Sequence, residues 1–163
     1  TSGNHNAYLA FGTRVNGGAL TEKLRITSKG GVHFNNAELI ERVNITSGKL
    51  SANQNIDLEN GMAHLFTTTE TTTATPNIRV NSSTSLNSVM ATGDVISVII
   101  ITTAATAGYA SSITIDGTGE TLRWNGGDPP SEGGAAGNDF YNYSIIKTAD
   151  AKFTILAIVA SFD

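Results

Sequence analysis

Short runs of alternating polar and apolar residues, separated by turns rich in glycine and asparagine, fill most of this chain. The pattern is clearest at Lys23–Thr27, where Leu24 and Ile26 fall on one face of a strand. The flanking Gly17-Gly18 and Gly30-Gly31 pairs suit tight turns. The strands expected in this first part are Tyr8–Arg14, Lys23–Thr27 and Val32–Asn35.

Glu38–Ile45 fits two elements. Leu39, Val43 and Ile45 follow the period of two of a strand, whereas Leu39, Ile40 and Val43 fit one face of a helix. Because the neighbouring segments are strands, the pattern favours a strand.

A second set of strands begins near Ile56. Ile113–Asp116, Gly117 and Glu120–Trp124 form the strongest hairpin signal, with Asp-Gly at the turn. Ser85–Met90 suits one helical turn capped by Ser85. The expected strands are Ala63–Thr69, Asn77–Val80, Asp94–Thr103, Ser111–Asp116, Glu120–Trp124, Phe140–Lys147 and Lys152–Phe162. The residues expected to lie mainly in the core or an interface are Val95, Val98, Ile100, Ile113, Ile115, Ile145, Ile155 and Val159. So many short strands between polar loops predict an antiparallel sandwich.

Thr67–Thr75 contains seven threonines and Glu70. A segment of such low complexity is compatible with a disordered linker or a glycosylated stalk. Because threonine is β-branched, an exposed strand or a long connection between strands fits better.

Composition excludes several classes of protein. The chain has 163 residues, no cysteine and a net charge of −4, which leaves no disulfide scaffold and argues against nucleic-acid binding. The longest apolar run, Val98–Ile101, is far shorter than the roughly 20 residues of a membrane span, so no membrane insertion is expected.

Charge divides the chain into two parts. Residues 1–62 carry six basic and five acidic side chains, a net of +1, whereas residues 63–163 carry four and nine, a net of −5. This shift predicts two modules joined within Ser47–Asn60. We place the first module at residues 1–50 and the second at 51–163.

Catalytic patterns are missing from the sequence. His5, His33 and His64 lack partners at metal-ligand spacing, so neither a metal nor a cofactor is expected. The carboxylate pairs Asp128/Glu132 and Asp116/Glu120 suit solvated turns better than acid catalysis. We expect no enzyme.

Aromatic residues gather in the second module, and Trp124 precedes the glycine- and proline-rich segment 125–137. Two interpretations of Trp124 are open: an indole exposed to stack on a sugar, or packing in the core or at its rim. The segment itself could contact a host ligand or pack on a neighbouring subunit. The candidate ligand-binding or receptor-binding residues are Trp124, Asn125, Asp128 and Tyr109.

Residues 8–34 carry a recognisable string, with Phe11-Gly-Thr13 followed by Thr21-Glu-Lys-Leu-Arg-Ile-Thr-Ser28 and Gly30-Gly-Val32. This string resembles the repeated module of tailed-phage fibres and related virion appendages. The Gly-Ile-Gly that often follows the valine there is replaced by His33-Phe34. The matching residues are Ala10, Phe11, Thr13, Thr21, Glu22, Lys23, Leu24, Arg25, Ile26, Ser28, Gly30 and Val32.

The second half is similar to C-terminal domains of marine phage structural proteins. The segments that carry this second likeness are Asn55–Gly61, Thr92–Asp94, Trp124–Gly127 and Ser144–Ala149. These resemblances imply a homotrimer at the virion surface, with a stalk-like β module followed by a jelly-roll-like antiparallel β-sandwich head. Phe11, Leu24, Ile26 and Val32 would be its assembly residues.

Physical reasoning agrees with assembly, because residues 1–50 contain too few apolar residues to close a core of their own. The sequence therefore predicts a virion structural protein, a fibre segment whose head attaches to a host glycan or envelope protein. Two alternatives stay open: a capsid decoration or head-fibre protein that docks on the shell, and a glycan-degrading tailspike.

Overall fold

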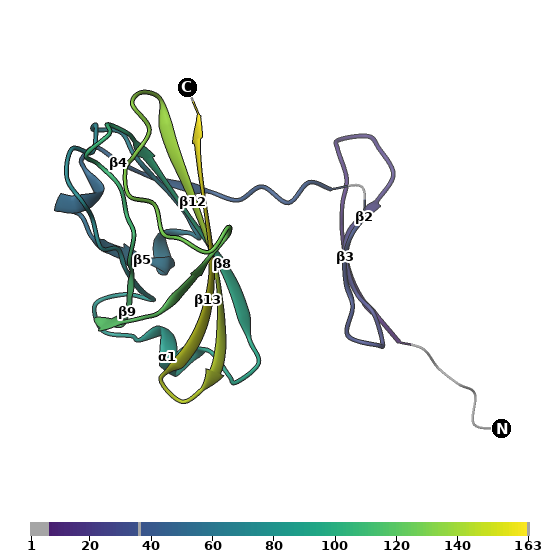
Figure 1. The fold of residues 1–163 in the computed structure, drawn as a ribbon. Coiled ribbons are helices and arrows are strands. Elements are labelled where there is room, and N and C mark those ends of the chain that lie inside the picture. The colour runs from purple at the N-terminus through teal and green to yellow at the C-terminus, as the bar shows by residue number, and fades with distance from the viewer. Residues whose placement is uncertain (1–6, 36, 163) are drawn as a thin grey trace. The chain divides into compact units, whose positions relative to one another are not determined.

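The computed structural model describes residues 7–35 and 37–162, which form two compact units, one as far as Ile40 and one from Glu41. We call them the N-terminal unit and the C-terminal unit. The prediction of an all-β protein is confirmed, because the single α-helix among the described residues has four residues. Figure 1 shows the strands of both units.

The N-terminal unit is one antiparallel sheet in the order β1-β2-β3. Its strands are β1 (Leu9–Thr13), β2 (Thr21–Ile26) and β3 (Val32–Phe34). All three strands predicted here are confirmed. Glycines at positive φ, Gly17 and Gly30, lie in the two turns, as their sequence pattern predicts.

The C-terminal unit contains two sheets that enclose the core. The larger has the order β11-β13-β12-β8-β6-β4 and the smaller the order β10-β9-β7-β5. Strands of the larger sheet are β4 (Val43–Thr46), β6 (Ala63–Phe66), β8 (Val95–Thr103), β11 (Leu122–Trp124), β12 (Asn138–Ala149) and β13 (Lys152–Phe162). Those of the smaller sheet are β5 (Asn55–Asp57), β7 (Asn77–Arg79), β9 (Thr114–Ile115) and β10 (Thr118–Gly119).

Three short helical segments interrupt the strands: the 3₁₀ turns Leu50–Ala52 and Leu58–Asn60, and α1 (Leu86–Val89). The predicted cap of α1 is confirmed, because the Ser85 side chain accepts a hydrogen bond from the backbone nitrogen of Ser88 at 3.1 Å. Lys147 packs at the other end of α1 and donates from Nζ to the carbonyl oxygens of Asn87 and Met90.

The prediction of a strictly antiparallel sandwich is wrong. The chain alternates between the two sheets from β4 to β9, so β4, β6 and β8 run parallel in one sheet, and β5, β7 and β9 run parallel in the other. Successive strands of one sheet therefore lie one winding apart and point the same way. In the larger sheet, β8, β12 and β13 form the expected antiparallel ladder, to which β11 adds in parallel, and in the smaller sheet β9 and β10 also pair antiparallel.

Like residues stack between neighbouring windings of the smaller sheet. Ile56, Ile78 and Ile115 are in register, and each is at most 1% exposed. Beside them, Asn77 donates to Asn55 Oδ1 at 2.9 Å. The strands of successive windings therefore place similar residues at equivalent positions.

The boundary between the units lies earlier than the sequence predicted. β4 pairs with β6, so residues from Glu41 onward belong to the C-terminal unit, whereas we had placed residues 1–50 in the first module. The strand predicted within Glu38–Ile45 is confirmed only at its end, where β4 starts at Val43.

The core draws on both sheets. Six of the eight residues expected in the core or an interface are buried, Val159 is partly buried, and Val95 is 61% exposed because it points outward from the start of β8. The predicted hairpin at Asp116-Gly117 is half right. The turn is present, with φ of 51° and 82°, but β9 pairs with β10, and β11 crosses to the larger sheet.

Candidate functional site

Four connections of the C-terminal unit gather at one end, which we call the loop end: residues 47–54, 67–76, 104–113 and 125–137. They gather there because β4, β6, β8 and β11 all run in the same direction. In Figure 1, the C-terminus lies at one end of this unit, and α1 and the turn between β12 and β13 lie at the other.

Glu70 holds the loop end together. Its side chain is 1% exposed, and its carboxylate accepts hydrogen bonds from the nitrogen of Ser51 at 2.7 Å and that of Thr71 at 2.9 Å. Burial raises the pKa of Glu70, but the hydrogen bonds from Ser51, Thr72 and Thr71 outweigh burial and lower it overall. Glu70 is therefore an ionised anchor between two connections.

The threonine-rich segment 67–75 is an ordered connection from β6 to β7, as one interpretation of its sequence predicted. Its threonines point outward from Thr67 to Thr69 and from Thr71 to Thr73, whereas Glu70 and Ala74 are buried. The loop end therefore presents a row of exposed threonines, and the hydroxyls of Thr67, Thr71 and Thr72 also form hydrogen bonds within the chain.

Trp124 does not belong to the exposed site. Its side chain is 9% exposed and packs edge-to-face against Tyr143, with ring centroids 6.3 Å apart. We correct its assignment as a ligand-binding residue, because β11 pairs with β13 and turns the indole into the core. The alternative that Trp124 is a core residue is the one the structure supports.

Three predicted residues do lie near the loop end. Asn125 and Asp128 are exposed on segment 125–137, and Tyr109 is half-buried, with its carbonyl oxygen accepting from the nitrogen of Ala74 at 2.8 Å. The segment is fixed at its far end by Asp139, which accepts from the nitrogen of Gly134 and from the Ser161 hydroxyl at 2.6 Å.

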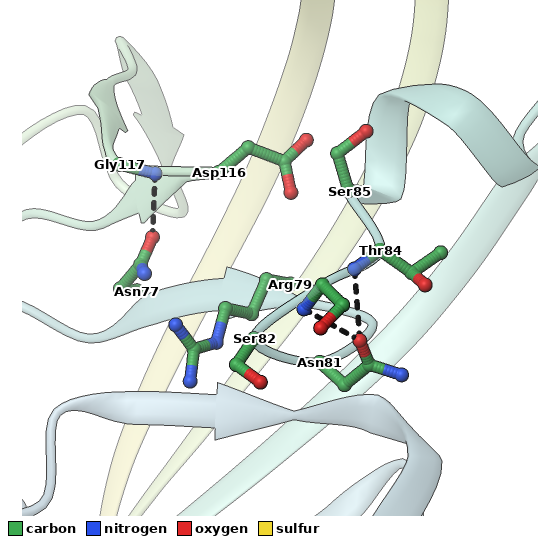
Figure 2. Close-up of a pocket in the computed structure, with 9 residues that line it drawn as sticks. Asn77, Arg79, Asn81, Ser82, Thr84, Ser85, Asp116 and Gly117 are labelled. Atoms are coloured by element: carbon green, nitrogen blue, oxygen red, sulfur yellow. Dashed lines mark hydrogen bonds between the residues drawn. The ribbon is translucent and has the colours of Figure 1, made fainter.

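A polar pocket of about 390 Å³ opens at the smaller sheet, and Figure 2 shows its residues. The Asn81 side chain accepts from the nitrogens of Ser83 and Thr84, and Asn77 accepts from that of Gly117 at 2.8 Å. Arg79 bonds to Asp57. Asn81 thus holds the turn 81–85, whereas Asn77 holds Gly117 and Arg79 is paired with Asp57. The serine and threonine hydroxyls of the turn are left as the groups that a ligand could contact.

Asp116 and Glu120 line a smaller pocket of about 230 Å³ beside this one. Burial raises the pKa of Glu120. Both oxygens of Asp116, however, accept backbone hydrogen bonds at the start of α1, from Leu86 at 2.7 Å and from Asn87 at 2.9 Å. Asp116 is thus a structural cap, a role that the sequence interpretation as solvated turn polarity missed.

The other polar residues considered as catalysts or ligands lie apart. Glu132 and Asp128 are exposed on segment 125–137, and His33 is exposed on β3. His64 is 2% exposed and lies between Asn44 and the carbonyl oxygen of Gly61. Within 7–35 and 37–162, no cluster of three or more His, Cys, Asp or Glu residues could hold a metal ion, and His5 lies outside the described residues.

One face of the N-terminal unit carries two adjacent rows of apolar residues. Register places Leu9, Ile26 and Val32 in one row and Phe11, Leu24 and Phe34 in the next. Arg25 lies on the opposite face, where its guanidinium bonds to Glu22 and stacks 4.2 Å from the Tyr8 ring centroid. The predicted assembly residues thus come together, and the structure adds Leu9 and Phe34 to them.

This apolar face is uncovered in the single chain. No residue of 7–35 or 37–40 is buried, and Phe11 and Val32 are 52% and 57% exposed. A sheet of this size is marginal in water without something to cover its apolar side.

Comparisons with protein-family models, with curated proteins and with solved structures found no match to this chain. No helix in the described part of the chain is long and apolar enough to cross a membrane. The two surfaces that bear on function are the apolar face of the N-terminal unit and the loop end of the C-terminal unit.

Proposed function

We propose that this chain is a non-enzymatic structural protein of a tailed-phage virion, in which the N-terminal unit assembles copies and the C-terminal unit forms an exposed head. The observation that carries the proposal is the apolar face of the N-terminal unit. Six apolar side chains cover one side of a sheet that has no buried residue among those described before Glu41.

Covering this face would stabilise the unit substantially. Each half-exposed side chain contributes about 1 kcal/mol when it is buried, so six contribute roughly 6 kcal/mol per chain. That is comparable with the whole stability of a small domain. Assembly with other copies would bury this face and so stabilise the folded unit. The resemblance to fibre modules favours a homotrimer.

The loop end is the surface that we assign to attachment. It combines exposed threonines 67–69 and 71–73 with Asn125 and Asp128, all on loops fixed to a rigid two-sheet frame. Loops held in this way are where recognition sites commonly lie. Hydroxyl and amide groups suit a host-surface glycan or a polar patch of an envelope protein.

A non-enzymatic role agrees with the carboxylates. Inverting and retaining glycosidases need one carboxylate free to act as base or nucleophile. Both carboxylate oxygens of Asp116 accept hydrogen bonds from the backbone at the start of α1, so Asp116 is not a free carboxylate that could act as base or nucleophile beside Glu120.

Labelling of intact particles tests the proposal. Gold-labelled antibodies against the C-terminal unit should decorate the surface of the phage particle, and the labelled site distinguishes a tail fibre from a capsid decoration. If mass spectrometry does not detect the chain in purified phage particles, the proposal is wrong.

A further inference from the structure

The outer face of the larger sheet carries two rows of mostly apolar residues that cross five of its six strands. Register aligns five apolar side chains across five strands, one in each of β4, β6, β8, β12 and β13. This row consists of Ile45, Leu65, Ile101, Phe140 and Ala160. The next row consists of Val43, Ala63, Ile99, Asn142 and Ile158.

Several of these side chains are open to solvent in the single chain. Ile45 is 67% exposed, Ile158 is 49% exposed, and Leu156 beside it is 46% exposed. Phe162, 58% exposed, packs edge-to-face on Phe140, with ring centroids 6.3 Å apart. The face therefore ends in an aromatic pair rather than in charges.

The smaller sheet shows that this is not a general property of the unit. Its outward residues are polar and already paired: Asn77 bonds to Asn55, and Arg79 to Asp57. A sheet with one side toward solvent normally alternates in this manner. Only the larger sheet departs from it.

The size of the face matches that of a specific interface. Six strands about 4.8 Å apart span roughly 24 Å, and the nine residues of β8 extend over about 27 Å. The resulting area, roughly 600 Å² before side-chain relief is added, approaches the ~800 Å² that each partner buries in a standard protein interface. The two apolar rows occupy part of this area, and the row beside them contains Ser97 and Ser144.

We propose that this face is a second self-association surface, at which each C-terminal unit packs on another copy of the same chain. The proposal rests on the proposed assembly through the N-terminal unit. It adds where the C-terminal units meet.

Charge favours a second copy as the occupant. Residues 41–163 carry six basic and twelve acidic side chains, a net of −6, yet the two rows contain no charged residue, and Arg123 lies beside them, opposite Leu156 at the β11 edge. Two such faces can therefore approach without the like-charge repulsion that the rest of the unit would impose. A charged partner would find no complementary group there.

The connection between the units strengthens this choice. β3 ends at Phe34 and β4 starts at Val43, so the chain between them reaches about 30 Å at most. Copies joined through their N-terminal units would hold their C-terminal units at a high effective concentration, so a weak contact would suffice.

Thiol protection in the 163-residue chain tests the inference, because the sequence has no cysteine of its own. Ser97→Cys places one thiol on the outer face, at an exposed position in β8. Ser82→Cys is the matched control, exposed in the turn after β7. At concentrations where the chain is associated, we expect maleimide to react with the thiol at 97 at least tenfold more slowly than with the thiol at 82.

Dilution identifies the occupant. The two rates should become equal, within about twofold, when the chain dissociates to single copies. Equal rates in the associated state would overturn the inference, because the face would be open. Protection that persists in single copies would also overturn it, because the same chain would then cover the face.

Charge substitution gives an independent readout. Ile158→Glu should weaken association at least tenfold in sedimentation equilibrium. Ile45→Glu, at the opposite side of the face, should do the same and serves as the deciding variant if Ile158→Glu fails to fold. Unchanged association of a folded variant would contradict the proposal.

The same measurement separates this inference from the proposed function. If only the N-terminal unit assembles the chain, Phe11→Asp dissociates it and Ile158→Glu leaves its mass unchanged. If assembly through the N-terminal unit is wrong, Phe11→Asp leaves the mass unchanged while Ser97→Cys can still be protected.

Discussion

Glu70 accepts hydrogen bonds from both the backbone nitrogen and the hydroxyl of Ser51, at 2.7 and 2.9 Å. The two residues lie on successive windings of the chain, one after β4 and the other after β6. Their contact joins the connections 47–54 and 67–76 of the loop end, which are not paired as strands. The buried Glu70 carboxylate, with its several hydrogen-bond donors, therefore fixes the threonine-rich loop 67–75 in place.

Replacing this carboxylate should destabilise the C-terminal unit. Glu70→Gln presents an amide N–H₂ to backbone donors, so we expect a loss of about 3 kcal/mol in the free energy of unfolding at pH 7, measured with urea. Glu132→Gln, at an exposed position of segment 125–137, is the control and should change it by less than about 0.5 kcal/mol.

The effect of Glu70 should depend on pH. Because its pKa is lowered in the folded state, its stabilisation is complete above the unfolded value of about 4.3 and is lost as the pH falls through the folded pKa. The difference between the native chain and Glu70→Gln should therefore shrink in acid. A difference that does not change with pH would argue that the carboxylate charge is unimportant.

His64 should make stability depend on pH in a higher range. Burial lowers its pKa, and its ring lies between the Asn44 side chain and the carbonyl oxygen of Gly61. The unfolded chain binds the proton more tightly, so stability is full above about pH 6.5 and falls as the pH drops from there toward the folded pKa. His64→Gln should remove this slope in urea titrations at pH 5 to 7.5, whereas His33→Gln, at an exposed position, should keep it.

Much of the local structure could be predicted from the sequence. Alternation located most strands, and the Ser85 cap and the Asp116-Gly117 turn were identified because each depends on neighbouring residues alone. Pairing partners were not predictable in the same way, because an alternating strand looks the same whether its neighbour runs parallel or antiparallel. The winding nevertheless has a signature in the sequence, because Asn55-Ile56 recurs as Asn77-Ile78, 22 residues later and in register.

The candidate site was harder to predict than the fold. Trp124 precedes a loop rich in glycine and proline, which by itself is compatible with exposure. What decides its burial is the pairing of β11 with β13, a contact more than 30 residues away in the sequence. Asp116 and Glu70 likewise acquire their roles from distant backbone donors.

Trp124 should behave as a core residue in solution. As the only tryptophan, it should emit at short wavelength and resist acrylamide quenching. Trp124→Ala should lower the free energy of unfolding by about 3 to 5 kcal/mol by circular dichroism, and Trp124→Phe by clearly less. An emission maximum typical of a solvated indole would contradict the burial.

Gly108 should tolerate no side chain. A Cβ at this position would overlap the carbonyl of Glu70, so Gly108→Ala should cost about 1 to 3 kcal/mol in urea unfolding. Gly119→Ala is the matched control, because nothing lies within 4 Å of its added methyl group. Equal stability of the two variants would show that the two loops pack less closely than described.

The mass of the 163-residue chain in solution tests the central claim, that its N-terminal unit joins copies. Sedimentation equilibrium at micromolar concentrations should give three times the 17.0 kDa of one chain, and Phe11→Asp should shift the mass toward one. A native chain that stays at 17.0 kDa at these concentrations, with a folded N-terminal unit, would contradict the account.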